Sequence, residues 1–256
     1  LGSAPITITY QARLLDDVVH NQAITNIAKL TYDTDSNPAL SRQLKDQDDA
    51  TIGVRLNDTV EKTITATDNP YTTGTNVAVG ETVTYRIKAT LGEGKQGLVI
   101  TDAMPSGLQY VSSKVISIGG NVQDSTVLVT NLGDNVVNTL ATVVVEVVAK
   151  VAGGTASGTN LLNTATLSPT IPTNPYGVPP GPMPPSVDTK TVTVVSATVG
   201  NFAFEDQNGD GIQQGTEPGV QGVVVQLRDM GGNIVATQTT GANGLYLFTN
   251  VVPGQY

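Results

Sequence analysis

Apolar residues alternate with polar ones in short stretches along most of this chain, and turn-forming residues separate the stretches. Alternation places every second side chain on one face of an extended strand, whereas a helix needs apolar residues every three or four positions. The stretches cover residues 77–88, 98–102, 140–151, 161–167, 189–195 and 222–227. Strands of this length and spacing are typical of β-sandwich modules, so we predict an all-β chain.

The charge balance argues against two classes of partner. The 256 residues carry 13 Lys and Arg against 22 Asp and Glu, a formal net charge of −9. Such a chain repels nucleic-acid phosphates and anionic membrane surfaces, and no apolar run approaches the roughly 20 residues of a membrane span. The absence of Cys excludes disulfides and thiol chemistry. We therefore expect no nucleic-acid partner and no membrane insertion in this segment.

One stretch of sequence occurs twice. Residues 24–30 (ITNIAKL) reappear 137 positions later as residues 161–167 (LLNTATL), and a strand-like stretch precedes each copy. Such a repeat indicates tandem modules. We expect residues 1–56 to be the C-terminal strands of one module, residues 57–197 to be a complete module, and residues 198–256 to be a third module, incomplete at its C-terminus. The unpaired edges of the first segment favour strand sharing with a neighbouring module or copy.

Three polar residues, each on a different predicted strand, lie on the inward face of their strands. Alternation places Lys62, Asp102 and Asn163 on the same side as their apolar neighbours. A buried, unpaired charge is strongly unfavourable, so we expect the three side chains to meet or to be neutralised. Alternatively, Lys62 extends to the rim, Asp102 binds a turn and Asn163 caps a bulge. Asn26 occupies the same kind of inward position, and any lysine partner of Asn26 would lie outside this chain.

The middle segment resembles a known repeat. Residues 79–85 (VGETVTY), 100–108 (ITDAMPSGL) and 163–167 (NTATL) are similar to the repeat of bacterial surface proteins called domain of unknown function eleven, and to fimbrial isopeptide-forming domains. The resemblance covers roughly residues 60–195, and residues 1–56 look like the tail of the same repeat. It implies tandem immunoglobulin-like β-sandwich modules.

The same resemblance implies a self-catalysed cross-link. In isopeptide-forming domains a desolvated lysine amine attacks the side-chain amide of an asparagine, a protonated carboxyl polarises the amide carbonyl, and ammonia leaves. The matching residues here are Lys62 as the amine, Asn163 as the amide and Asp102 as the catalytic acid. Glu146 is the rival acid, but it shares its strand face with Thr142 and Lys150, so we expect it to point outward.

Residues 206–217 (DQNGDGIQQGTE) form the most specific local motif of the chain. Oxygen-bearing side chains at loop positions 1, 3, 5 and 12, with Gly at position 6 and an apolar residue at position 7, reproduce a calcium loop of the EF-hand type. The predicted ligands are the side chains of Asp206, Asn208, Asp210 and Glu217 and the backbone carbonyl of Ile212. An acidic surface turn is the alternative interpretation. Because the flanking segments read as strands, a bound Ca²⁺ would be structural.

The context of this loop resembles a second family. Residues 199–202, 218–223, 244–248 and 253–256 closely resemble the B-like domain of serine-aspartate repeat proteins (SdrD B-like). The resemblance implies a calcium-rigidified stalk of a bacterial surface protein. The family often has Asp in the turn that corresponds to residues 241–244, where this chain has none, so we do not expect a second ion there.

These features predict a non-enzymatic structural segment of an extracellular bacterial surface or fibre protein, such as an adhesin stalk, a surface layer or a filament. Calcium and Lys–Asn isopeptide bonds would rigidify it, and its partners would be neighbouring modules or copies of the same protein. One alternative is an adhesin that contacts a host or cell-surface ligand through the loops 33–49 or 168–186. Another alternative is the spacer of a large secreted hydrolase.

Overall fold

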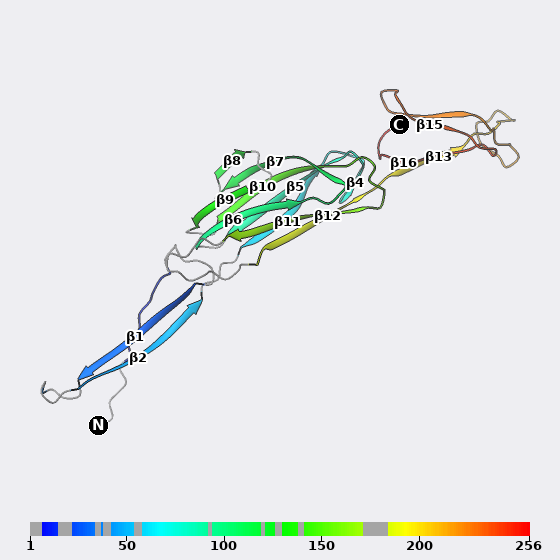
Figure 1. Ribbon diagram of the computed structural model, residues 1–256. Coiled ribbons are helices and arrows are strands. Elements are labelled where there is room, and N and C mark those ends of the chain that lie inside the picture. Colours follow the sequence, from blue (N-terminus) through cyan, green and yellow to red (C-terminus); the bar gives the residue numbers. More distant parts are fainter. Residues whose placement is uncertain are drawn as a thin grey trace.

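The computed structural model describes residues 7–14, 22–33, 37, 42–53, 58–91, 94–118, 121–125, 130–137, 141–170 and 184–256. Every regular element in these ranges is a β-strand, which confirms the all-β prediction. Within them, no helix is long and apolar enough to cross a membrane. Figure 1 shows an N-terminal hairpin, a central sandwich and a C-terminal module, following one another in chain order.

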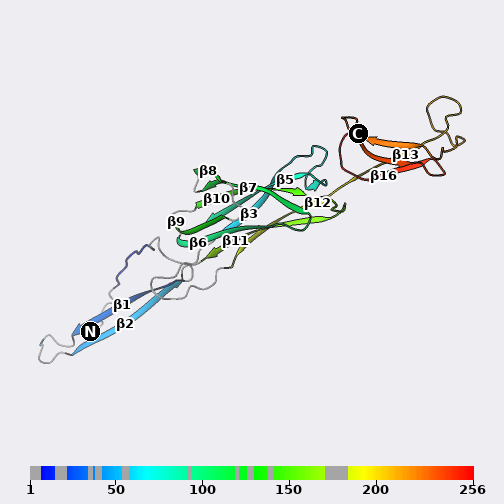
Figure 2. The ribbon, with the colours of Figure 1, turned by 45° about the horizontal axis from the view of Figure 1, so that its top comes forward.

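The central part is a sandwich of two five-stranded sheets (Figures 1 and 2). The first sheet has the order β3 (Thr59–Thr67), β5 (Thr82–Leu91), β10 (Ala141–Val151), β7 (Leu108–Ile118) and β8 (Asn121–Ser125). The second has the order β4 (Asn76–Val77), β12 (Ser186–Val194), β11 (Asn160–Thr170), β6 (Gly94–Ala103) and β9 (Thr130–Val137). Neighbouring strands are antiparallel except β12 and β4, which run parallel. This architecture is the predicted immunoglobulin-like sandwich.

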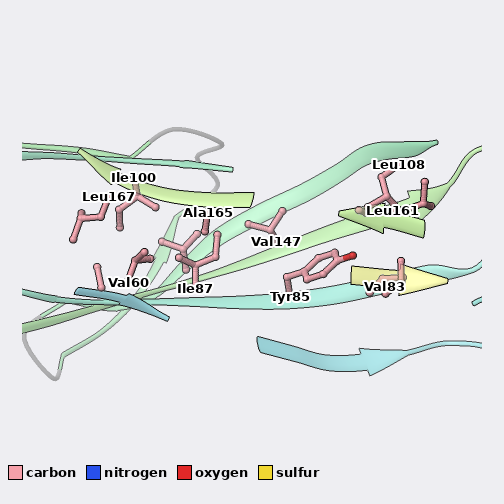
Figure 3. Close-up of a cluster of buried hydrophobic side chains, with 14 of the residues drawn as sticks. Val60, Val83, Tyr85, Ile87, Ile100, Leu108, Val147, Leu161, Ala165 and Leu167 are labelled. Atoms are coloured by element: carbon pink, nitrogen blue, oxygen red, sulfur yellow. The ribbon is translucent and has the colours of Figure 1, made fainter. Parts of the chain in front are cut away.

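Strict alternation builds the core between the two sheets. From the first sheet, β5 buries Val83, Tyr85, Ile87, Ala89 and Leu91, and β10 buries Val143, Val145, Val147, Ala149 and Val151. From the second sheet, β11 buries Leu161, Ala165 and Leu167 against them. Figure 3 shows some of them, including Tyr85, Val147 and Leu161, meeting between the layers. Full burial of one large apolar side chain stabilises the fold by about 1.5–3 kcal/mol, so this face holds the sandwich together.

The motif at residues 79–85 closes one end of the sandwich. Gly80 has a φ of +83°, a left-handed conformation that favours glycine, and it turns the chain into β5. The buried Glu81 carboxylate accepts hydrogen bonds from the Ala78 amide at 2.7 Å and the Thr72 hydroxyl at 2.8 Å. The backbone of Glu81 also pairs with Val151 at the end of β10. The carboxylate therefore ties the loop before β5 to the end of the sheet.

The N-terminal part is an antiparallel ribbon of β1 (Ala23–Asp33) and β2 (Gln43–Gly53). The sequence predicted a charged loop from residue 33 to residue 49, but residues 43–49 belong to β2 and are exposed. That prediction was wrong because a ribbon with two solvent-facing sides accepts charged residues that a strand covered on one face would exclude. The predicted proline-rich loop 168–186 has its central residues, 171–183, outside the described residues.

The C-terminal module has two small sheets. One pairs β13 (Ala197–Phe202) with β16 (Leu245–Val251), and the other pairs β14 (Val224–Arg228) with β15 (Ile234–Thr239). Leu227, Phe248 and Val251 form its buried apolar cluster, which is far smaller than the core of the sandwich. Close backbone contacts supplement this cluster: a Cβ on Gly219 would lie 2.1 Å from the carbonyl oxygen of Asn243.

A short junction joins the sandwich to this module. β12 ends at Val194 and β13 begins at Ala197. The side chain of Asn69, in the loop after β3, donates a hydrogen bond of 3.1 Å to the carbonyl of Pro253. Asn250, which has a φ of +55°, lines a groove at this junction together with Val79 and Val194. The two parts therefore touch directly as well as being linked in sequence.

We predict that Gly219→Ala destabilises the C-terminal module by about 1–3 kcal/mol, because the added methyl group has no room beside the Asn243 backbone. Hydrogen exchange of the amides in β16 would measure the loss. Gly241→Ala is the control, since its nearest neighbouring atom is 4.0 Å from the added Cβ. Equal protection of β16 in the two variants would contradict this account of the packing.

Candidate functional site

Lys62 lies on β3, at the edge of the first sheet, and its side chain is completely buried. Its backbone amide donates a hydrogen bond of 2.6 Å to Asp188 on β12, in the opposite sheet. Lys62 faces Ile87 across the β3–β5 ladder, so Tyr85, on the same face two residues away, is its diagonal neighbour. The lysine therefore points into the space between the sheets and does not reach the rim.

The structure brings the three predicted residues together. The Lys62 ammonium forms an ion pair with Asp102 Oδ1, and the two side chains are 0% and 1% exposed. Asn163 Nδ2 donates a hydrogen bond of 3.2 Å to the other carboxylate oxygen of Asp102. Asp102 pairs with Ala165 in the β6–β11 ladder, and this register makes it the diagonal neighbour of Asn163. The aspartate thus bridges the lysine and the asparagine.

The contact between Asp102 and Asn163 runs through the amide nitrogen. The isopeptide resemblance implies a protonated Asp102 carboxyl that polarises the Asn163 carbonyl, whereas in the structure Asp102 accepts a hydrogen bond from Asn163 Nδ2. The other oxygen of Asp102 is ion-paired with Lys62, so both oxygens of this side chain have partners. The Asn163 carbonyl oxygen is buried and has no hydrogen-bond partner.

Burial dominates the electrostatics of the lysine. Desolvation lowers the pKa of Lys62 below its ordinary value of 10.5, and the hydrogen bond and charge of Asp102 partly offset that effect. The ammonium also lies 4.6 Å from the centroid of the Tyr85 ring, a cation–π contact. A lowered lysine pKa raises the fraction of neutral amine, which is the nucleophilic form.

Tyr85 is the fourth member of this buried cluster. Burial raises the pKa of its hydroxyl, the nearby Asp102 carboxylate raises it further, and the Asn163 side chain lowers it in part. No hydrogen bond of normal geometry joins the hydroxyl to Asn163 or to any other group. The hydroxyl therefore stays protonated well above neutral pH and has a proton to donate.

Glu146, the rival acid, lies away from this cluster. Its carboxylate is 3.4 Å from the Lys114 ammonium and 3.8 Å from the Arg86 guanidinium. Both basic side chains are about half exposed, on the outer face of the first sheet. As predicted from alternation, Glu146 points outward.

Two members of the cluster were not predicted from the sequence. Tyr85 sits on the inward face of the alternating stretch 79–85, so alternation could have identified it as a neighbour of Lys62. Asp188 carries no such signal, because its role depends on how β12 packs against β3. The backbone bond from Lys62 is the main cause of a lowered Asp188 pKa.

The N-terminal hairpin repeats half of this arrangement. In the β11–β12 pair, Asn163 lies two positions before Ala165, and Ala165 pairs with Asp188. In the β1–β2 pair, Asn26 likewise lies two positions before Ala28, and Ala28 pairs with Asp48. Asn26 is exposed and donates a hydrogen bond to the hydroxyl of Tyr10. The hairpin therefore carries an asparagine and an aspartate in the same register as Asn163 and Asp188.

The predicted calcium loop is folded around its own carboxylates. Asp206 accepts hydrogen bonds from the backbone amides of Gly209, Asp210 and Gly211, at 2.7 to 3.2 Å. Gly209 and Gly211 have φ values of +75° and +76°, which favour glycine and allow the chain to curl around Asp206. The sharp turn expected at the sixth loop position, Gly211, is therefore present.

The other predicted ligands hold the remainder of the loop. Glu217 is buried, and its carboxylate accepts hydrogen bonds from the backbone amides of Gln207 and Gln214, each at 3.0 Å. Asp210 accepts the amide of Ile212 at 2.8 Å, and this bond is the main cause of a lowered Asp210 pKa. Within the described ranges, no three acidic, His or Cys side chains are gathered as a metal site.

One buried oxygen of the loop, Gln214 Oε1, has no hydrogen-bond partner and could bind a cation. Gln214 Oε1 is buried without a partner, while its Nε2 donates to Asp210 at 2.7 Å. Gln214 occupies position 9 of the loop, which contributes a ligand in EF-hand loops, often through a water. Each carboxylate also retains lone pairs beyond those used by the backbone amides. The donor set, rich in oxygen and without nitrogen or sulfur, suits Ca²⁺.

Comparison with known proteins identifies the C-terminal module. Residues 197–256 match the model of the SdrD B-like domain, which confirms that part of the sequence resemblance. Serine-aspartate repeat-containing protein F of Staphylococcus epidermidis is 49% identical over 59 residues, 23% of this chain and 3% of that protein. Serine-aspartate repeat-containing protein I of Staphylococcus saprophyticus is 41% identical over 71 residues, 28% of this chain and 4% of that protein. The chain thus spans a small fraction of the length of these relatives.

The fold as a whole is similar to a solved pilin. BcpA, the major pilin subunit of Bacillus cereus, aligns with a TM-score of 0.53 and 18% identity, over 82% of this chain and 66% of that one. At this level of identity the similarity concerns the fold alone. It agrees with tandem immunoglobulin-like β-sandwich modules.

The lowered Lys62 pKa gives a measurable pH dependence. In an Asn163→Ala variant, which keeps the amine and Asp102 but lacks the amide, the Lys62 Cε resonance should titrate with a midpoint below 10.5. Between the pH of that midpoint and pH 10.5, Lys62 is protonated in the unfolded chain but largely neutral in the folded one. The free energy of unfolding therefore rises with pH across this interval. Carbon NMR of labelled lysine and chemical denaturation would measure both effects. A midpoint at or above 10.5 would contradict the lowered pKa and would mean that the charge of Asp102 outweighs desolvation.

Proposed function

We propose that this chain is a structural segment of an extracellular bacterial surface or fibre protein, stiffened by a covalent cross-link in its sandwich and by calcium in its C-terminal module. The observation that carries the proposal is the buried contact of Lys62, Asp102 and Asn163 between the two sheets. The relationship of residues 197–256 to serine-aspartate repeat proteins supports the surface location. The similarity of the middle segment to the surface-protein repeat and to isopeptide-forming domains points the same way.

The proposed cross-link is an isopeptide bond between Lys62 and Asn163. The neutral Lys62 amine attacks the side-chain carbonyl carbon of Asn163, a new C–N bond forms, the bond to Nδ2 breaks and ammonia leaves. Asp102 bridges the incoming nitrogen and the departing one, so it can take a proton from the first and give one to the second. This role replaces the carbonyl-polarising role that the sequence suggested for Asp102.

The position of the bond gives it a mechanical purpose. Lys62 lies on β3, the first strand of the sandwich, and Asn163 lies on β11, next to the last strand β12. A tensile load enters through β3 and leaves through β12. A covalent bond from β3 to β11 would carry that load past the strands between them, so those strands would not unravel under tension.

Calcium would serve the C-terminal module in place of a large core. Asp206, Asn208, Asp210, Glu217 and the carbonyl of Ile212 are the proposed ligands, and Gln214 is added to them because its buried oxygen lacks a partner. The ion would neutralise the crowded carboxylates and hold residues 206–217 as one compact loop between β13 and β14. A modest affinity is sufficient outside the cell, where calcium is millimolar; extracellular modules bind it at about 10⁻⁴–10⁻³ M.

The module boundaries follow from the same repeat. Residues 1–56 are proposed as the C-terminal strands of one immunoglobulin-like repeat, residues 57–197 as the next, and residues 198–256 as the SdrD B-like module. The shared register of Asn26 and Asp48 with Asn163 and Asp188 supports the first assignment. Neighbouring modules or copies of the same protein are the proposed partners, through pairing with the free edges of the β1–β2 ribbon.

The cross-link predicts an intact mass, measured under denaturing conditions, that is lower than the sequence mass by one ammonia. Lys62→Ala and Asn163→Ala should each restore the full mass, and Lys88→Ala, on the exposed side of β5, should keep the deficit. Tandem mass spectrometry of a digest should yield one branched peptide that contains both Lys62 and Asn163. A full-mass protein without such a peptide would remove the cross-link from the proposal.

The calcium site predicts a stability that depends on the metal. At a free Ca²⁺ concentration of 100 times the dissociation constant, binding should stabilise the C-terminal module by about 2.7 kcal/mol. Asp206→Ala should abolish the difference between calcium and chelator in thermal unfolding, because Asp206 organises the loop. Asp229→Ala is the matched control, since Asp229 closes a separate turn with Asn233. A calcium effect that survives in Asp206→Ala would place the ion elsewhere.

A further inference from the structure

Two buried polar atoms beside the Lys62–Asp102 pair have no hydrogen-bond partner. They are the hydroxyl of Tyr85 and the carbonyl oxygen of Asn163. One is a donor and the other is an acceptor, and the Asn163 side chain is close enough to the Tyr85 hydroxyl to lower its pKa in part. Leaving a buried polar group unsatisfied costs about 1–3 kcal/mol, so an adjacent unpaired donor and acceptor call for an explanation.

The geometry of Tyr85 places it against the reacting atoms. Its ring centroid is 4.6 Å from Lys62 Nζ, and its side chain is completely buried. Figure 3 shows the ring extending from β5 between the sheets toward the end of the core where Leu161 lies. Leu161 and Ala165 flank Asn163 on the inward face of β11. The hydroxyl thus projects along the inward face that presents the Asn163 side chain.

Asp102 is not free to polarise the Asn163 carbonyl. One carboxylate oxygen is bound to the Lys62 ammonium and the other accepts from Asn163 Nδ2. Attack on an amide places negative charge on its oxygen, and that charge needs a donor aimed at it in a site without water. Among the groups described in this cluster, the Tyr85 hydroxyl is the uncommitted donor.

We propose that Tyr85 is the oxyanion donor of the cross-linking reaction: its hydroxyl forms a hydrogen bond to the Asn163 carbonyl oxygen as Lys62 attacks, and stabilises the charge that develops there. This assignment rests on the proposed isopeptide function. It divides the catalysis between two residues, with Asp102 moving protons between the nitrogens and Tyr85 stabilising the oxygen.

The steps balance without any other reactant. The Lys62 ammonium gives one proton to Asp102, and the neutral amine adds to the Asn163 carbonyl carbon, leaving an oxyanion held by Tyr85. Asp102 returns its proton to Nδ2, the C–Nδ2 bond breaks as the carbonyl re-forms, and ammonia departs. Asp102 accepts the second proton from Nζ and passes it to ammonia. Lysine ammonium and asparagine amide thereby become an isopeptide and an ammonium ion.

The test is the rate of ammonia loss by Tyr85→Phe, which keeps the ring and its packing but removes the hydroxyl. The full chain is made by cell-free synthesis in a short pulse, samples are quenched in acid at intervals, and intact mass gives the reacted fraction. Loss of one oxyanion donor lowers rates by roughly a hundredfold or more, and we expect a fall of this size. Tyr110→Phe is the matched control, because Tyr110 is half exposed and its hydroxyl contacts Ser113.

A second variant separates donation from packing. Replacing Tyr85 by 3,5-difluorotyrosine makes the hydroxyl more acidic and a stronger donor with little change of shape, so the cross-linking rate should rise above that of the natural chain. If the cross-linking rate falls in Tyr85→Phe but does not change on fluorination, Tyr85 acts through its packing, and the proposal is overturned. Equal rates for Tyr85→Phe and the natural chain would also overturn it, while leaving the cross-link intact. A natural chain that never loses ammonia would overturn both the cross-link and the role of Tyr85.

Discussion

The buried ion pair between Lys62 and Asp102 is the interaction on which the middle module depends. Removing two charges from water is strongly unfavourable, and a single missing partner in such a pair costs about 3–5 kcal/mol. The surrounding residues are arranged accordingly: Asn163 binds the second carboxylate oxygen, the Tyr85 ring contacts the ammonium, and Asp188 holds the lysine backbone. The pair therefore fixes how β3, β6 and β11 meet. An isopeptide bond would remove the lysine charge and replace this fragile balance with a covalent link.

The sandwich and the C-terminal module obtain rigidity in different ways. The sandwich has a continuous apolar core between two five-stranded sheets, and the proposed cross-link spans that core. The C-terminal module buries a small apolar cluster and relies on close backbone contacts at Gly219 and on an acidic loop that curls around Asp206. A metal suits a module of this kind, because ion binding to the folded state supplies stability that a small core cannot. The two devices together suit a segment that must resist extension.

The β1–β2 ribbon and the β11–β12 pair share a sequence pattern but differ in solvent exposure. Its asparagine and aspartate have the same register as Asn163 and Asp188, yet Asn26 is exposed whereas Asn163 is buried. The difference lies in what covers each hairpin: β11 and β12 have β3 and β6 against them. The charged residues 46–49 are tolerated within β2 because they face solvent on this ribbon. Local pattern alone could not distinguish a charged loop from a charged strand.

The sequence by itself determined the alternating core strands β5, β10, β11 and β12, the inward direction of Lys62, Asp102 and Asn163, and the calcium-loop motif of residues 206–217. These follow from local rules, since alternation sets side-chain direction and ligand spacing sets loop chemistry. The tertiary structure decided which oxygen of Asp102 meets which partner, that Tyr85 and Asp188 join the site, and that Gln214 has an unpaired oxygen in the loop. These depend on the register and packing of strands far apart in the chain, and the pattern within any one strand does not specify them.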